Sequence, residues 1–176
     1  MTERGRVHIN TGNGKGKTTA ALGLALRARA HGRRVLWASF HKDPGRWGYR
    51  EQESLAGLGV DVRQFAPRHP MCDPDVTAAE LRTECLAAVA ALRDLFAADR
   101  YDLVVLDEIL ISVREGYLHE EEVAALIEAR PLHLELVLTG HGATPGLIAK
   151  ADLVTEMTPV KHYFDQGEAA RKGIEF

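Results

Sequence analysis

Apolar segments of strand length alternate with helix-forming segments along nearly the whole chain. We expect strands at residues 6–11, 35–40, 60–66, 101–108, 134–140 and 152–157. We expect helices at 18–31, at 119–131, at 144–151 and over a longer segment after Thr77, with a loop at 41–51. Strands that alternate with helices form parallel sheets, because each crossover returns the chain to the same end of the sheet. The alternation therefore predicts a single α/β domain over residues 1–176, with a mostly parallel sheet, helices on both faces and functional loops at the carboxyl ends of the strands.

The composition is that of an ordinary globular domain. Of 176 residues, 45% are hydrophobic and 27% charged, which favours neither a disordered chain nor a membrane protein. A net charge of −3 gives no broad basic surface for nucleic acid, and no apolar run approaches the roughly 18 residues of a membrane span. The start, MTERGRVHINT, lacks the apolar segment of a signal peptide, and two cysteines are too few for a disulfide framework. We expect a cytoplasmic protein that binds neither nucleic acid nor membranes.

The segment after Thr77 predicts the longest helix. Thr77 and Glu80 have the spacing of a capping box, in which each side chain bonds to the backbone N–H of the other residue. One apolar face then recurs at helical spacing, through Leu81, Cys85, Val89, Leu92 and Phe96. Cys85 lies on this face, which indicates core packing rather than chemistry, and Trp37 is likewise expected in the core. We interpret the glutamates at 120–122 as solvated surface at the start of a helix rather than as a metal cluster.

The segment TGNGKGKTTAALGLALRARAHG, residues 11–32, places glycines and lysines between a strand and a helix. This context indicates a P-loop, in which backbone N–H groups and the helix N-terminus face a phosphate. Lys17 would add a point charge, and Thr18 would supply the hydroxyl expected on Mg²⁺. The full pattern requires a glycine five residues before Gly16, where this chain has Thr11, so the loop is one residue short. The alternative is a glycine turn that precedes a helix by chance.

The apolar strand at 101–108 ends in two acids, Asp107 and Glu108. A P-loop enzyme needs a carboxylate at the end of a neighbouring strand, where it holds the metal or its waters. Adjacent residues on a strand point to opposite faces, so the two acids cannot do the same job unless the strand has ended. One of them could instead cap the following segment. We favour a functional pair, because a buried strand seldom ends in two acids without a partner.

Four segments together resemble the ATP:corrinoid adenosyltransferases of cobalamin biosynthesis and salvage: TGNGKGKTTAALGLALRA, YDLVVLDEI, RPLHLELVLTGHG and ADLVTEMTPVKHYFDQGEAARKGIEF. The match runs in order from about Gly5 to Phe176. The resemblance implies that the 5′-deoxyadenosyl group of ATP is transferred to the Co(I) centre of a reduced corrinoid, with triphosphate as the leaving group. It also implies that the nucleotide lies reversed in the shortened loop. Co(I) is itself a strong nucleophile, so no catalytic histidine is expected.

The resemblance also implies which residues form the site. The triphosphate of ATP would be bound by Gly12, Asn13, Gly14, Lys15, Gly16, Lys17 and Thr18. Lys15 and Lys17 would be catalytic, because fixed cations stabilise the charge of the leaving group. Thr18 and Glu108 would hold Mg²⁺. Family members are typically homodimers, so we expect a homodimer, and we also expect an electron donor that reduces the corrinoid.

The chain departs from the family in the loop after the third predicted strand. Family members commonly have glycine, phenylalanine, any residue and tryptophan there, and the aromatics help to displace the lower axial ligand of the corrinoid. Residues 68–71 of this chain are Arg, His, Pro and Met. His69 or Met71 could instead pack on the corrin face. The alternatives are an ordinary polar loop and a metal site formed by His69 with Cys72.

Two other positions bear on the corrinoid and nucleotide sites. Trp47 and Tyr49, in the segment predicted as a loop, are candidates for contact with the large planar corrinoid. His141 stands where the family usually has arginine, which removes a permanent cation.

Two other functions remain open at this point. The missing aromatics favour a protein that binds or senses corrinoid in an ATP-dependent way without transferase activity, whereas the intact loop and acids favour the enzyme. An unrelated P-loop kinase or ATPase is the other alternative, and it would not release triphosphate. For the enzyme, the altered loop predicts a preference for corrinoid precursors that lack a lower base.

Overall fold

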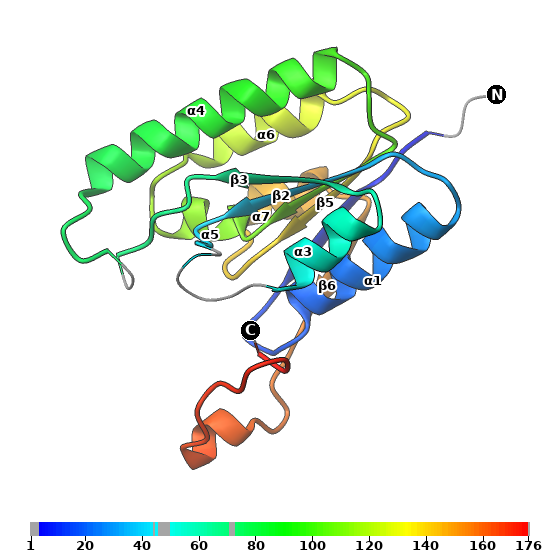
Figure 1. Cartoon of the computed structure of the whole chain (residues 1–176). Helices are drawn as coiled ribbons and strands as arrows, with labels where there is room; N and C mark the ends of the chain where they lie inside the picture. Colours follow the sequence, from blue (N-terminus) through cyan, green and yellow to red (C-terminus); the bar gives the residue numbers. More distant parts are fainter. Residues whose placement is uncertain (1–3, 44, 46–49, 71–72, 176) are drawn as a thin grey trace.

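The computed structural model describes residues 4–43, 45, 50–70 and 73–175. Strands and helices alternate through this part of the chain (Figure 1). The strands are β1 (Val7–Thr11), β2 (Val35–Phe40), β3 (Asp61–Phe65), β4 (Leu103–Asp107), β5 (Glu135–Thr139) and β6 (Leu153–Glu156). The helices are α1 (Lys17–Ala30), α3 (Arg50–Gly57), α4 (Ala78–Ala97), α5 (Ile109–Arg114), α6 (Glu120–Ala129), α7 (Pro145–Lys150) and the 3₁₀ helix η1 (Tyr163–Gln166). No helix in these described residues combines the length and the apolar character that crossing a membrane requires.

The strands form one six-stranded sheet in the order β3–β2–β4–β5–β1–β6, and all neighbouring pairs are parallel. The predicted α/β architecture is therefore confirmed, and its parallel sheet is consistent with a P-loop-like fold. Because the strands are parallel, the carboxyl ends of β1, β2, β4 and β5 lie together at one end of the sheet. The loops that follow these four strands carry the candidate site.

Helices cover both faces of the sheet (Figure 1). On one face, α1 and α3 pack against β2, β4 and β5 through a cluster that includes Ala21, Ala25, Leu55, Trp37, Val105 and Val137. On the other face, α4, α5, α6 and α7 contribute Leu81, Cys85, Leu92, Leu110, Leu126 and Leu147 to the larger core. Trp37 and Cys85 are 1% and 0% exposed, so both lie in the core as predicted. Successive strand residues alternate between the two clusters, as the period of a β-strand requires.

The helix ends follow the capping signals. Thr77 accepts a hydrogen bond from the backbone N–H of Glu80, whose side chain accepts from the backbone N–H of Thr77, so the predicted capping box is present. In the acidic run at the start of α6, Glu121 is exposed and Glu122 forms an ion pair with Arg82 at 2.8 Å. Among the described residues no cluster of three or more histidine, cysteine or acidic side chains could hold a metal ion. Glu121 therefore lies on the surface, as expected, whereas Glu120 and Glu122 are half-buried.

Two predicted boundaries beside the candidate site were wrong, and helix α5 was not predicted. Helix α3 begins at Arg50, inside the segment 41–51 that we predicted as a loop, because Gln52 and Leu55 are buried on one side of it. The strand predicted to end at residue 108 ends one residue earlier: Glu108 adopts a left-handed conformation with φ 68°, and α5 follows at once. A left-handed residue breaks the alternation of a strand, so Asp107 and Glu108 are not constrained to opposite faces.

The last strand, β6, and the residues after it are less covered than the rest of the sheet. All four residues of β6 are exposed, which is unusual for a strand in a parallel sheet. The chain then forms a C-terminal segment, residues 157–175, which extends from the carboxyl end of the sheet and contains η1 (Figure 1). This segment lies beside the glycine-lysine loop, because Gly14 N–H donates to the carbonyl of Met157 at 2.6 Å.

Candidate functional site

The glycine-lysine loop, residues 12–16, joins β1 to α1 in a conformation that requires glycine. Gly12 and Gly16 have φ of 93° and 121°, which other residues rarely adopt. A Cβ at Gly12 or Gly14 would also come within 2.5 Å or 2.8 Å of the carbonyl oxygen of Met157. Gly16 precedes α1 and has no side chain with which to cap it, so the helix N-terminus faces the loop. This arrangement suits an anion, because N–H groups and the positive end of the helix dipole converge there.

Lys17 is the first residue of α1, and its ammonium group lies inside the loop. Its Nζ donates to the carbonyls of Gly12 and Gly14, both at 2.9 Å. The residue is 7% exposed. Burial lowers the pKa of Lys17, and the nearby carboxylate of Glu108 opposes this shift. Two loop carbonyls therefore hold a cation at the start of α1.

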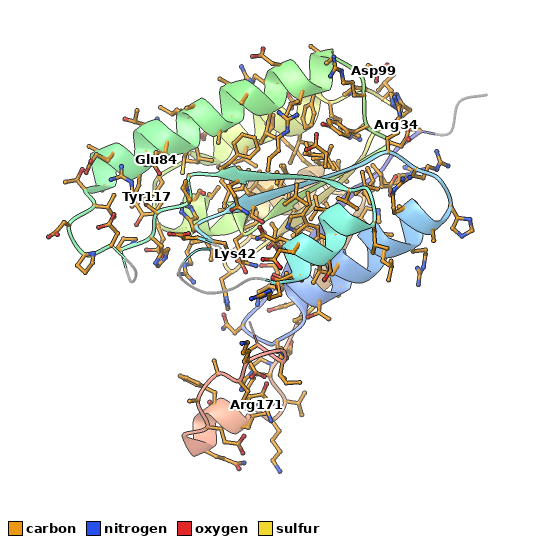
Figure 2. The ribbon with its side chains drawn as sticks, in the orientation of Figure 1. Arg34, Lys42, Glu84, Asp99, Tyr117 and Arg171 are labelled. Carbon is orange, nitrogen blue, oxygen red and sulfur yellow. The ribbon has the colours of Figure 1, made fainter. Side chains whose placement is uncertain are left out.

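Lys15 is exposed and points toward the C-terminal segment rather than into the loop. Its Nζ donates to the carbonyl of Ile174 at 2.5 Å and lies 3.6 Å from a carboxylate oxygen of Glu175. Arg171 and Tyr163 bond to the same carboxylate and hold its pKa at about 2. The Arg171 guanidinium also lies 4.7 Å from the centre of the Tyr163 ring, in the segment seen below the sheet in Figure 2. Lys15 thus links the glycine-lysine loop to the C-terminal segment, whereas Arg171 makes its contacts within that segment.

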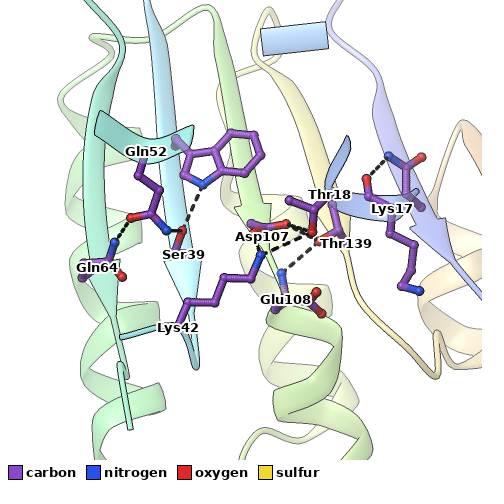
Figure 3. A network of polar contacts seen from close by, with 11 residues as sticks. Lys17, Thr18, Ser39, Lys42, Gln52, Gln64, Asp107, Glu108 and Thr139 are labelled. Carbon is purple, nitrogen blue, oxygen red and sulfur yellow. Dashed lines mark hydrogen bonds and ion pairs between the residues drawn. The ribbon is translucent and has the colours of Figure 1, made fainter. Parts of the chain in front are cut away.

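Asp107 is the centre of a buried network at the end of β4 (Figure 3). Its Oδ1 accepts hydrogen bonds from the hydroxyls of Thr18, at 2.9 Å, and Thr139, at 2.8 Å. Its Oδ2 forms an ion pair with Lys42 Nζ at 2.5 Å. The same ammonium lies 3.4 Å from the Thr18 hydroxyl. The network therefore joins the segments that follow β1, β2, β4 and β5.

Lys42 and Thr139 are the residues of this network that were not expected from the sequence, and Lys42 is the charged one. It lies within the segment 41–51, whose glycines and proline we interpreted as a loop without assigning it a role. The available signal was its place just after an apolar strand, where a parallel sheet gathers its functional side chains. That signal alone could not single out Lys42 from other polar residues that follow strands.

Glu108 occupies a different position from Asp107. Its backbone N–H donates to the Thr139 hydroxyl at 2.9 Å, but its Oε2 atom is buried without a hydrogen-bond partner among the described residues. Burial and the neighbouring Asp107 raise the pKa of Glu108, while Lys42 and Lys17 lower it. We predicted that Thr18 would act with Glu108, whereas the hydroxyl of Thr18 bonds to Asp107. A buried carboxylate oxygen without a donor is a ligand group suited to a hard cation.

The histidines of the site lie at two places. His69 is half-buried, and its ring packs edge-on against that of His41, with centroids 5.9 Å apart. His41 follows β2 and is buried, with Nε2 2.7 Å from the Ser112 hydroxyl and Nδ1 3.1 Å from the carbonyl of Arg68. Burial lowers the pKa of both histidines. His41 was not expected from the sequence, and it supports the loop that carries His69.

The remaining predicted residues fall in two groups. His141 lies against the glycine-lysine loop, with Nδ1 3.4 Å from Oδ1 of Asn13. Burial is the main cause that lowers the pKa of His141, and Lys17 adds to it. Met71 and Cys72, with Trp47 and Tyr49, lie outside the described residues.

Comparison with known proteins identifies the family. The family described as ATP:corrinoid adenosyltransferase BtuR/CobO/CobP matches residues 3–176. The chain is 39% identical over 175 residues to the corrinoid adenosyltransferase CobA of Salmonella typhimurium, covering 99% of this chain and 87% of that protein. It is 39% identical over 178 residues to the corrinoid adenosyltransferase of Pseudomonas aeruginosa, covering 99% and 85%, and 37% identical over 175 residues to that of Escherichia coli K12, covering 99% and 87%. The loop that encloses Lys17, the carboxylates that follow β4 and a match over nearly the whole chain place this protein in the ATP:corrinoid adenosyltransferase family.

Proposed function

We propose that this protein transfers the 5′-deoxyadenosyl group of ATP to the Co(I) centre of a reduced corrinoid and releases triphosphate. The observation that carries the proposal is the loop around Lys17, which faces the carboxylates of Asp107 and Glu108 in a chain that belongs to this family. The whole chain, residues 1–176, would form a single transferase domain. Because ATP is the adenosyl donor, we place the protein in the cytoplasm.

Residues 12–18 would act as a P-loop that binds the triphosphate. Lys17 already lies within the loop, where 7% of its surface is exposed, so its charge needs little reorganisation to meet a phosphate oxygen. Lys15 bonds to the C-terminal segment and would have to exchange Ile174 and Glu175 for the nucleotide. Both cations would stabilise the negative charge that develops on triphosphate as the bond to the ribose carbon breaks. They supply electrostatic stabilisation, and no general base is required.

Mg²⁺ would be held by oxygen ligands at the end of β4. The Thr18 hydroxyl and the carboxylates of Asp107 and Glu108 are the hard ligands that this ion prefers, and the orphaned Oε2 of Glu108 fits such a role. Bound Mg²⁺ would neutralise charge on the triphosphate. The chain's own contribution is to place these oxygens beside the loop and to keep them out of bulk water.

The corrinoid would bind beside His69 and the segment that follows β2. The His69 ring packs against His41, whose own ring is held by contacts with Ser112 and Arg68. These contacts fix the surface on which His69 packs. Trp47, Tyr49 and Met71 remain candidate contacts. We further propose a homodimer and an external electron donor for the corrinoid; both are implied by the reaction and the family.

An anaerobic assay tests the proposed function. The purified protein is mixed with ATP, Mg²⁺ and a chemically reduced corrinoid, and the adenosylcorrinoid and the phosphate products are measured. Formation of adenosylcorrinoid with equimolar triphosphate is the expected result. Orthophosphate release without adenosylation would indicate a kinase or ATPase. ATP-dependent corrinoid binding without any product would indicate a binding or sensing protein.

A further inference from the structure

The ammonium group of Lys42 lies beside Asp107 and Thr18, two of the side chains proposed to hold the divalent cation (Figure 3). Its Nζ is 2.5 Å from Asp107 Oδ2 and 3.4 Å from the Thr18 hydroxyl. In P-loop proteins, the hydroxyl that follows the loop lysine and a carboxylate at the end of a neighbouring strand bind Mg²⁺. Lys42 therefore bonds to the same oxygens that the metal would use.

The position of Lys42 is set by the sheet. β2 and β4 are neighbours, and Ser39 pairs with Asp107 in their register. Lys42 follows three residues after Ser39, where the chain has left β2, and its side chain points toward the end of β4 (Figure 3). The residue is 9% exposed, so it is held in place rather than extended into water.

Charge explains why a cation is needed here. Asp107 is 0% exposed, and a buried carboxylate is costly unless a cation and hydrogen bonds compensate it. The two threonine hydroxyls satisfy Oδ1, and Lys42 satisfies Oδ2. A divalent cation at the same oxygens would repel the ammonium and replace its contribution.

We infer that Lys42 and the divalent cation exchange places on Asp107 and Thr18, so that metal binding depends on nucleotide. Lys42 is tethered to the site, and a free metal ion must displace it without offering it another anion. A nucleotide triphosphate supplies that anion, which releases Asp107 and Thr18 to the metal. The inference rests on the proposed function, because it assumes that the nucleotide enters with a metal ion.

Mn²⁺ binding tests the exchange without any turnover. Mn²⁺ accepts the same oxygen ligands as Mg²⁺, and its free concentration is read by electron paramagnetic resonance. We expect the wild-type protein to bind Mn²⁺ weakly alone and strongly with ATP. Lys42→Met should bind Mn²⁺ alone at least about tenfold more tightly than the wild type, a change of about 1.4 kcal/mol. Lys42→Arg, which keeps a cation beside Asp107, should behave as the wild type does.

Two controls locate the effect. Lys150→Met removes an exposed lysine that pairs with Glu128, far along the chain from Lys42, and should leave Mn²⁺ binding unchanged. The double variant Lys42→Met with Asp107→Asn should lose the gain, because the metal then lacks the carboxylate from which Lys42 was removed. Equal binding of Mn²⁺ alone by the wild type and Lys42→Met would overturn the inference.

Folding of the variant is a second readout. If Lys42→Met is unfolded without metal, circular dichroism during an Mn²⁺ titration should show that the ion restores the folded signal. Absence of any restoration counts against the exchange.

The adenosylation assay of the wild type separates the exchange from the proposed transferase function. Normal adenosylation with no gain of Mn²⁺ binding in Lys42→Met rejects the exchange alone. A gain of Mn²⁺ binding in a protein without adenosylation rejects the transferase function alone.

Discussion

The hydroxyl of Thr18 donates a hydrogen bond to Asp107 Oδ1 at 2.9 Å, which joins the first turn of α1 to the end of β4. The two residues are 89 positions apart in the chain. Through Asp107, the network also includes Thr139, the last residue of β5, and Lys42, which follows β2. One buried carboxylate therefore joins segments from the ends of four strands.

Asp107→Asn should destabilise the whole fold. The substitution leaves the Lys42 ammonium beside a neutral group, and breaking a buried ion pair costs about 3 kcal/mol. Urea unfolding followed by circular dichroism measures the free energy of unfolding. Glu121→Gln, at an exposed position on α6, should change it by less than about 0.5 kcal/mol. Similar losses in both variants would show that the pair contributes no special stability.

Lys17→Ala should abolish ATP binding. The ammonium of Lys17 is the cation held within the loop by Gly12 and Gly14, and its loss leaves the triphosphate without that charge. Isothermal titration with Mg²⁺ and ATP measures the affinity, and Lys150→Ala serves as the matched control. Wild-type affinity in Lys17→Ala would remove the P-loop assignment.

Glu108→Gln should lower the Mg²⁺-dependent activity far more than Glu121→Gln. The Oε2 of Glu108 is buried without a hydrogen-bond partner among the described residues, whereas Glu121 is exposed on α6. The measurement is the rate of adenosylation as a function of Mg²⁺ concentration. Comparable effects at the two positions would mean that the metal ligands lie elsewhere.

Buried His41 should make the protein less stable in mild acid. Its pKa lies below the ordinary 6.5 because burial disfavours the imidazolium. As the pH falls below 6.5, the ordinary pKa of histidine, the unfolded chain takes up a proton at this position before the folded chain does. The free energy of unfolding therefore falls until the lower pKa of the folded state is reached.

The variant His41→Asn isolates this contribution. Asparagine tolerates the φ of 55° at this position and does not titrate. Urea unfolding at about pH 7 and about pH 5 should show a smaller loss of stability in His41→Asn than in the wild type. His31→Asn, at an exposed position, is the control and should keep the wild-type loss. An unchanged pH dependence in His41→Asn would contradict the expectation.

The loop that carries His69 predicts a preference among corrinoids. Without the family's phenylalanine and tryptophan at 69 and 71, less of the free-energy cost of displacing an attached lower base should be offset. We expect a higher kcat/KM for cobinamide-like precursors than for complete cobalamin, and each factor of ten corresponds to about 1.4 kcal/mol. The double variant His69→Phe with Met71→Trp should narrow the gap. Equal efficiency on both substrates in the wild type would contradict this prediction.

Local patterns in the sequence were sufficient for the six strands, for helices α1, α4, α6 and α7 and for the family, but not for α3, α5 and η1. The alternation of apolar strands and helices, the capping box at Thr77 and the core positions of Trp37 and Cys85 were predicted correctly, because each depends on residues close together in the chain. The family resemblance, confirmed by the comparisons, also rested on contiguous motifs. The boundary at Glu108 was not predictable in this way, because a left-handed residue at the end of a strand has no reliable signature outside glycine and asparagine.

The sequence by itself determined that a glycine-lysine loop precedes a helix and that two acids lie at the end of a buried strand. Only the tertiary structure decided which acid meets Thr18, and that Lys42 joins them. The reason is strand order: β2 and β4 become neighbours although α3, β3 and α4 lie between them in the chain. Strand order follows from how the helices pack on the two faces of the sheet, which is a property of the whole domain. A network that spans four strand ends is therefore formed only when the sheet is complete.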